Sequence, residues 1–460
     1  MKGKGWPKWA RFMIKDWYYE DKGRAHDEFG EVFLVVSPGD LVCYVAAAKT
    51  AMNITSSQRK VFLKMREKTK MLDLFGPSVA TTNGDAWRFH LRITLPPFGD
   101  ALRQLVWVET RRQASMLAKA WTKNGVGQQL KHGIYLLTVN VASLANFGRR
   151  GDWTDGPENT PPNHKLSLAA AITLLNDYLG QILLMPKWLL AAQGVTEPDG
   201  RTGFTNKEIK GNLFLFLAAG YETTANSMLS SCIFLALHGD IQDRIIEEVD
   251  CVHHQAIEVS RVELSYTDDM PKFRYLTSFM YESLRVFTIV QSITRKVYEP
   301  QNLLVHDSST GETRNVQLPA GTAVIINNVA LHFLPLNWPS PHVLEPRRWL
   351  VSEPNTFDPL EKPTAAQEAD MAAGTTPIPN HERGTFMAFN EGLRACLGRI
   401  FAKAEFVAFF AHMLRDHRFE LDEDVSPADV ERIMRLRSGG SVVTLTPSEN
   451  VRVRLVPRKK

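Results

Sequence analysis

The sequence FNEGLRACLG, which ends at Gly398, combines residues that together suit a metal-thiolate site. Cys396 stands at the start of a predicted helix, where exposed amides and the helix dipole stabilise a thiolate. Gly392 and Gly398 permit a tight loop that brings the backbone close to a large planar cofactor. Arg394 is placed to offer its guanidinium to a cofactor carboxylate, and Phe389 to shield the sulfur from water. A lone cysteine is more often a small buried hydrophobic residue, so its neighbours carry this prediction.

A second unusual segment lies inside a long apolar stretch, residues 206–237. Gly220 costs about 1 kcal/mol in the middle of a helix relative to alanine. The acid Glu222 beside it costs more in an apolar element unless it has a partner. Two such costs in one turn, followed by the hydroxyl of Thr223, indicate a functional groove. The alternative is a kinked core helix with a solvated Glu222.

A third pair, Glu282 and Arg285, lies three residues apart on a predicted helix. This spacing puts the acid and the base on one helical face. Taken alone, such a pair is typical of a solvated surface and stabilises a helix by only tenths of a kcal/mol.

These segments resemble those of the cytochrome P450 family. The cysteine segment matches F-x-x-G-x-R-x-C-x-G at every defined position, and AGYETT, which ends at Thr224, resembles A-G-x-D/E-T-T. The resemblance implies that Cys396 is the metal ligand, the proximal thiolate of heme b (iron protoporphyrin). It also implies that Glu222 and Thr223 relay protons toward bound dioxygen.

The resemblance extends to the E-x-x-R helix and to PRRW, which ends at Trp349 and is similar to the family's P-E-R-F segment. Arg347 stands where Glu is usual, and Trp349 replaces Phe. The resemblance implies a buried network of Glu282, Arg285 and Arg348 that holds the loop behind the heme.

Two further residues are expected to contact the heme propionates by the same resemblance. Trp87 begins a segment similar to the family's W-x-x-x-R helix, but Leu91 occupies the arginine position and the charge is lost or moved to Arg92. Arg295 follows the E-x-x-R helix where the family places another propionate-binding arginine. The alternative for both Trp87 and Arg295 is an ordinary packing or surface residue.

Composition excludes several classes of protein. The 54 Lys and Arg residues exceed the 50 Asp and Glu residues by only 4, which is too mild for a nucleic-acid partner. The four cysteines include no CxxC pair, which disfavours a disulfide scaffold or a structural zinc site and favours a reducing compartment. No run approaches the roughly 18 apolar residues of a membrane-spanning helix.

The first 20 residues suggest a different membrane contact. Trp6, Trp9, Met13 and Trp17 recur at helical spacing among several Lys and Arg residues. A basic helix with a Trp stripe is suited to a membrane interface. The alternative is a surface helix that packs the stripe on the core.

The expected fold is mainly α with a minor β-sheet, a cytochrome P450 fold in a single heme domain spanning residues 1–460. Residues 31–47 predict two strands joined at a turn, residues 293–330 two or three strands, and residues 335–385 an irregular Pro-rich stretch. Predicted helical segments are 49–119 with breaks, 166–190, 206–237, 240–250, 273–287 and, as the last clear helix, 397–417.

The expected substrate is a lipophilic small molecule. The resemblance implies that segment 71–83, Phe216 with Ala219, and segment 289–293 line its pocket. No Gly-rich dinucleotide fold is visible, so the expected partner is NADPH–cytochrome P450 reductase, docked near Arg399 and Lys403. The chain is similar in style to filamentous-fungal members that oxidise secondary metabolites. The resemblance thus implies an NADPH- and dioxygen-dependent monooxygenase.

Two departures from the family leave alternatives open. The hydrophobic N-terminal anchor of eukaryotic relatives is not seen, although the resemblance implies the cytosolic face of the endoplasmic reticulum membrane and peripheral membrane contact. Relatives place tens of residues, including a helix that roofs the pocket, where segment 191–203 forms a short polar loop. The alternatives are a non-catalytic heme-binding remnant without a lid, and a reductase-independent heme-thiolate isomerase or peroxygenase.

Overall fold

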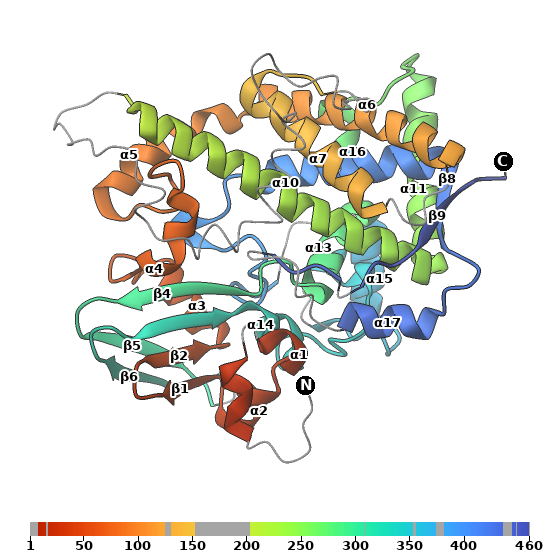
Figure 1. Cartoon of the computed structure of the whole chain (residues 1–460). Coiled ribbons are helices and arrows are strands. Elements are labelled where there is room, and N and C mark those ends of the chain that lie inside the picture. Colours follow the sequence, from red (N-terminus) through yellow and green to blue (C-terminus); the bar gives the residue numbers. More distant parts are fainter. Residues whose placement is uncertain are drawn as a thin grey trace.

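In the computed structural model, one long helix, α10 (Asn206–Leu237), runs through the molecule and carries the apolar stretch identified above (Figure 1). The structure describes residues 8–14, 17–124, 130–151, 203–308, 310–352, 356–373, 381–435, 444–447 and 449–459. A capping box starts α10, because the Thr205 hydroxyl accepts the N–H of Glu208 while the Glu208 carboxylate accepts the N–H of Thr205. The observed bounds of α10 match the predicted helical segment 206–237.

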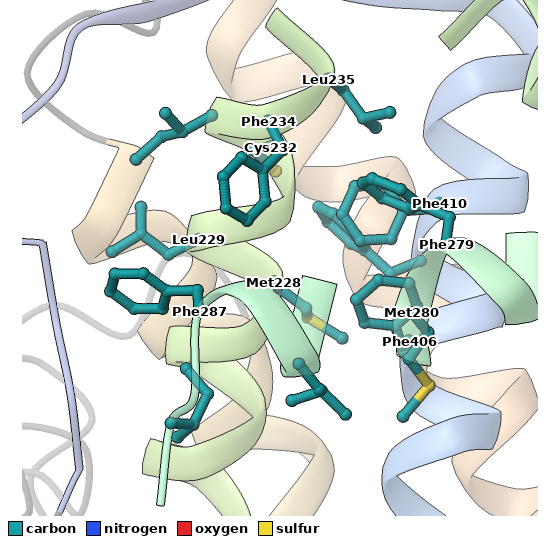
Figure 2. Packing of buried hydrophobic residues seen from close by; sticks show 14 of the residues in the cluster. Met228, Leu229, Cys232, Phe234, Leu235, Phe279, Met280, Phe287, Phe406 and Phe410 are labelled. Carbon is teal, nitrogen blue, oxygen red and sulfur yellow. The ribbon is translucent and has the colours of Figure 1, made fainter. Parts of the chain in front are cut away.

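Within the described ranges four long helices contact α10, namely α7 (Leu130–Phe147), α11 (Gly239–Glu258), α13 (Arg274–Val286) and α16 (Arg399–Asp416). Another long helix, α6 (Asp100–Asn124), packs against α7 and α16. The buried apolar side chains of these helices form one large core. Figure 2 shows Met228 of α10 near Phe279 of α13 and Phe406 of α16, and Leu229 near Phe287. The ring centroids of Phe279 and Phe406 lie 6.3 Å apart, within the range of favourable aromatic contact.

A five-stranded sheet lies at the other end of the molecule from this helical core (Figure 1). Its strand order is β1 (Val32–Val36), β2 (Leu41–Val45), β7 (Ala323–Asn327), β4 (Ser292–Val297) and β3 (Phe62–Lys64). Strands β2 and β7 are parallel, and the other neighbours are antiparallel. In the short edge strand β3, Lys64 lies opposite Arg295 of β4.

The remaining elements are short and surround these two layers. They are η1 (Lys8–Met13), α1 (Tyr18–Asp21), α2 (Arg24–Phe29), α3 (Ala48–Thr55), α4 (Arg66–Thr69), η2 (Lys70–Asp73), α5 (Gly84–Thr94), η3 (Pro96–Phe98), α12 (Tyr266–Asp269), η5 (Met270–Lys272), β5 (Gln301–His306), β6 (Thr313–Leu318), α14 (Asn328–Phe333), η6 (Pro346–Trp349), α15 (Ala365–Ala373), η8 (Gly392–Arg394), β8 (His417–Leu421), α17 (Pro427–Arg435) and β9 (Val453–Pro457).

Most predicted elements are confirmed, with three corrections. The predicted hairpin at 31–47 is β1 and β2, with the N–H of Ser37 donating to the carbonyl of Asp40 across the turn. Strand β3 interrupts the stretch expected to be mostly helical, four strands rather than two or three occupy 293–330, and α17 follows the predicted last helix. The predicted helix 166–190 and the predicted loop 191–203, except for Gly203, lie outside the described residues.

The N-terminal aromatic stripe divides between solvent and core. Trp9 is 62% exposed and Met13 is 74% exposed on the short helix η1. Trp17 is 5% exposed, and its indole N–H donates to the Tyr44 hydroxyl at 3.2 Å. The segment forms two short helices, so the single striped helix predicted for residues 1–20 is wrong in the part described. None of the helices in the described ranges has the length and apolar character needed to cross a bilayer.

Candidate functional site

The cysteine loop is closed by its own backbone. The N–H of Cys396 donates to the carbonyl of Phe389 at 2.8 Å, and the Asn390 amide donates to the carbonyl of Arg394 at 2.9 Å. Gly392 has a φ of 72°, and a Cβ added there would lie 2.6 Å from the carbonyl oxygen of Thr55. The loop therefore requires glycine at this position, both for its left-handed backbone and for its close approach to α3.

Cys396 differs in setting from two other cysteines, Cys43 and Cys232, which are buried in the core. Cys396 is exposed, yet desolvation by the protein packed behind it raises the pKa of its thiol. Hydrogen bonds from the backbone amides of Gly398 and Arg399, and the charge of Arg399, lower the pKa in opposition. Gly398 has an ordinary φ of −80°, so only close approach of a cofactor would require glycine there.

Arg394 reaches from the cysteine loop to the region before α5. Its guanidinium donates to the carbonyl of Thr82 at 3.0 Å and to Oδ1 of Asn83 at 3.2 Å. It also lies over the ring of Trp87, 4.1 Å from the centroid. The two predicted cofactor-binding residues Trp87 and Arg394 are thus brought together, and stacking fixes the plane of the guanidinium. Arg92 is exposed and lies over Phe89, so it does not replace the missing arginine.

Lys64 is a member of this site that the sequence reasoning missed. It faces Arg295 across β3 and β4, its ammonium donates to the carbonyl of Ala80 at 2.6 Å, and its backbone N–H donates to Asn83. Burial lowers the pKa of Lys64 to about 7, with further lowering by the charges of Arg394 and Arg295. The absence of the family's arginine at Leu91 was the only sequence signal that another cation was needed.

Lys64, Arg295 and Arg394 form a group that we call the cation cluster. Burial lowers the pKa of Arg295 to about 10, and burial together with Arg295 lowers the pKa of Arg394 to about 9. No acidic side chain among the described residues forms an ion pair with any of the three. Such a group is unfavourable unless an anion neutralises it. A heme beside Cys396 carries two carboxylates, so the residues present fit that cofactor.

Helix α10 opens toward solvent at the predicted groove. Ala219 is exposed within a helix that is otherwise largely buried, and a Cβ added at Gly220 would meet no atom within 4 Å. The hydroxyl of Thr223 donates to the carbonyl of Ala219 at 2.7 Å. Glu222 is buried and accepts a hydrogen bond from Thr444, so the alternative of a solvated Glu222 is wrong.

Apolar residues from two of the three predicted pocket segments meet in one cluster. Segment 71–83, helix α10 and the cysteine loop all contribute to it. Ile289 and Ile293 of the third segment belong to other clusters. The members of the shared cluster are Leu72, Val79, Ala80, Trp87, Leu91, Leu215, Phe216 and Leu397.

The predicted network of Glu282, Arg285 and Arg348 is confirmed and fully buried. Arg285 donates twice to the Glu282 carboxylate, at 2.7 and 2.9 Å, and Arg348 donates once at 3.0 Å. Burial alone would raise the pKa of Glu282, but the charges of the two arginines and their hydrogen bonds lower it to about 2. The indole N–H of Trp349 also donates to Glu282 at 2.9 Å, a bond that the family's Phe would lack.

This network positions the polypeptide behind the cysteine loop. Arg285 donates to the carbonyls of His332, Pro341 and Val343. The ring of His332 in turn accepts the N–H of Met387, two residues before Phe389, at 3.1 Å. The buried charges thereby connect α13 to the start of the cysteine loop.

Sequence comparison agrees with this site. Residues 182–447 match the family described as Cytochrome P450. The chain belongs to the cytochrome P450 family. The predicted cytochrome P450 fold is confirmed, as is the function of a heme monooxygenase at the level of the family.

Three cytochrome P450 relatives are fungal proteins. Cytochrome P450 monooxygenase prx9 of Penicillium rubens is 36% identical over 515 positions, covering 99% of this chain and 87% of the relative. Cytochrome P450 monooxygenase ORF6 of Penicillium roqueforti is 36% identical with the same coverage. The phomenoic acid biosynthesis cluster cytochrome P450 monooxygenase of Leptosphaeria maculans is 24% identical, covering 86% of this chain and 78% of the relative. Because this chain has 460 residues, at least 515 − 460 = 55 positions of the first alignment are gaps in it.

Proposed function

We propose that this cytochrome P450 is an NADPH- and dioxygen-dependent monooxygenase that inserts one oxygen atom into a lipophilic organic substrate. The observation that carries the proposal is the cation cluster beside the closed Cys396 loop, since a cofactor with two carboxylates would neutralise the cluster next to the exposed Cys396 sulfur. When bound, the heme supplies the centre at which dioxygen is activated.

We assign heme b to this site, with each protein residue in a defined role. Cys396 would supply the sulfur ligand to the iron, and Lys64, Arg295 and Arg394 would bind the propionates, with the Trp87 ring holding the Arg394 guanidinium in place. Phe389, Gly392 and Gly398 shape the loop. Phe389 does so through the carbonyl that accepts the Cys396 N–H.

Glu222 and Thr223 would hold and move the protons that the reaction consumes. The open space at Gly220 and the exposed Ala219 support a groove in α10 next to the Thr223 hydroxyl. We expect Thr223→Ala to keep the thiolate-type carbon monoxide band while it lowers the yield of product per electron pair consumed. If Thr223→Ala keeps the natural yield of product per electron pair, Thr223 is not part of the proton path.

We propose NADPH–cytochrome P450 reductase as the electron donor, docking on the face of α16. Arg399 is exposed there, whereas Lys403 is half-buried with its ammonium 6.0 Å from the centroid of the Tyr281 ring. Arg399 is therefore the better contact for an acidic partner. Arg399→Glu should slow electron transfer from the reductase, and more so at low ionic strength, because the interaction is electrostatic. Unchanged turnover in Arg399→Glu would place the docking face elsewhere.

We further propose secondary metabolism as the pathway class and the cytosolic face of the endoplasmic reticulum membrane as the location. The biosynthetic-cluster relative and the two Penicillium relatives support the first. Peripheral membrane contact is supported by Trp9 and Met13, whose apolar side chains point into solvent beside basic residues. Retention of a Trp9→Ser/Met13→Ser double variant on membranes, at the level of the natural chain, would argue against this contact.

The two alternative functions each have a distinguishing outcome. The first alignment leaves at least 55 positions without a residue of this chain, and a loss of those positions near 191–203 would favour a remnant without a lid. An isomerase or peroxygenase would use the same cofactor without a reductase.

The test is incubation of the chain with reductase, NADPH, labelled dioxygen and a panel of lipophilic metabolites. We expect one labelled oxygen atom in the product, formed only when NADPH is present. Product formed without NADPH would establish an isomerase. Product formed only with added peroxide would establish a peroxygenase. No product and no substrate-induced spectral shift, in a protein that still binds heme, would establish the remnant.

A further inference from the structure

A chain of three hydrogen bonds ends on the carboxylate of Glu222. The hydroxyl of Tyr135 on α7 donates to Oδ1 of Asn226 on α10 at 2.7 Å. The Nδ2 of Asn226 donates to the hydroxyl oxygen of Thr444 at 2.8 Å, and the Thr444 hydroxyl donates to Oε1 of Glu222. Residues from α7, α10 and the C-terminal region thus converge on one acid.

The chemistry of these groups fixes the direction of the chain. A carboxylate only accepts hydrogen bonds, so the single hydrogen of the Thr444 hydroxyl goes to Glu222. The Thr444 oxygen then accepts from the amide nitrogen of Asn226, which leaves the amide oxygen to accept from Tyr135. All three donors therefore point toward Glu222, an arrangement in which each bond polarises the next.

Burial makes the arrangement matter for the position of the carboxylate. Asn226 is 0% exposed, Thr444 is 5% exposed and Glu222 is 7% exposed. At such depth water does not easily replace a lost partner, and an unsatisfied polar group is costly. The position of the Glu222 carboxylate is consequently tied to the Thr444 hydroxyl.

Thr444 is itself fixed to the protein on a second side. The N–H of its neighbour Leu445 donates to the carbonyl of Ile289 at 2.9 Å. Ile289 begins segment 289–293, which follows α13. On α10, Glu222 directly precedes Thr223, whose hydroxyl faces the turn opened by Gly220. The C-terminal segment around Thr444 thus joins segment 289–293 to the turn of α10 that carries Glu222 and Thr223.

We propose that Thr444 is a positioning residue that holds the Glu222 carboxylate for proton delivery, and that Asn226 and Tyr135 hold Thr444. This inference rests on the proposed monooxygenase function. The amide of Asn226 is a poor proton carrier, so these three hydrogen bonds orient Glu222 and do not conduct protons from Tyr135.

Thr444→Val tests the proposal because it removes the hydroxyl and keeps the side-chain shape. We expect the yield of oxygenated product per electron pair to fall about tenfold, a modest part of the 10²- to 10⁴-fold that general acid–base catalysis contributes. The carbon monoxide band should not change, since the hydrogen bonds described for Thr444 join it to Asn226 and Glu222. Thr444→Ser should restore the yield to within about twofold, and Tyr135→Phe should reduce it by about two- to fivefold.

Thr446→Val is the matched control, because Thr446 is buried two residues further along and takes no part in the chain of donors. The proposal would be overturned if Thr444→Val kept the natural yield of oxygenated product per electron pair. It would also be overturned if Thr444→Ser lowered that yield as much as Thr444→Val does. Crystal structures of the two Thr444 variants give a result that does not depend on turnover. Glu222 should leave its position in Thr444→Val and keep it in Thr444→Ser. If the natural chain forms no product, the proposed function fails, and the position of Glu222 still decides the role of Thr444.

Discussion

Replacing Lys64 with methionine tests the cation cluster and has two opposite expected effects. In the heme-free protein the change removes a charge that lies beside Arg295 and Arg394 without an acidic partner, so unfolding should not become easier. In the heme-bound protein the same change removes a charged donor to a propionate. A hydrogen bond to a charged group contributes about 1.5–3 kcal/mol. At about 1.4 kcal/mol for each factor of ten, heme affinity should fall roughly ten- to hundredfold.

The pH dependence of heme affinity supplies a second signature of Lys64. Burial and the two arginines lower the pKa of Lys64 to about 7 in the heme-free protein, and neighbouring carboxylates would raise it. Below about pH 7 the ammonium is already charged, so heme affinity is at its full value. Above about pH 7 binding must take up a proton, so affinity decreases as the pH rises. Lys64→Met should abolish this decrease.

The assay is transfer of heme to a heme-scavenging protein, followed by absorbance between about pH 6 and 9. Lys296→Met is the matched control. Lys296 adjoins Arg295 on β4, but its ammonium pairs with Glu67 at 3.1 Å. The reasoning is refuted if Lys64→Met retains heme as tightly as the natural chain with the same pH dependence.

Two further predictions concern the scaffold of the site. Trp349→Phe removes one donor to the buried Glu282 carboxylate, so the free energy of unfolding should fall by about 1–2 kcal/mol in denaturant titrations; an unchanged value would show that this bond is energetically neutral. Gly392→Ala should displace the cysteine loop and reduce heme incorporation, because the added Cβ would lie 2.6 Å from a carbonyl oxygen at a φ of 72°. Gly398→Ala, at a φ of −80°, should leave the protein folded. Equal heme incorporation in the natural chain, Gly392→Ala and Gly398→Ala would contradict this account of the loop.

Local signals in the sequence predicted the elements that carry the site. The capping pair Thr205 and Glu208 and the apolar stretch behind them fix α10. The pattern around Cys396 identified the loop, and E-x-x-R identified the pair on α13. In each case the deciding interactions lie within a few residues of one another or within one motif.

The features that were missed depend on residues far apart in the chain. Strand β3 has three residues, too few to show an alternating pattern, and it forms through pairing with β4 more than 200 residues later. The place of Lys64 in the cation cluster follows from that pairing. The bond from Trp349 to Glu282 likewise requires the folded chain, which is why the departure from Phe looked like a weakness in the sequence.

The carbon monoxide difference spectrum of the reduced protein is the most direct test of the central claim that the Cys396 sulfur binds the heme iron. The account predicts a thiolate-type band for the natural chain and its loss in Cys396→Ser. Cys251→Ser, which changes another exposed cysteine, should keep the band. A histidine-type band in the natural chain, or a thiolate-type band that persists in Cys396→Ser, would contradict the account.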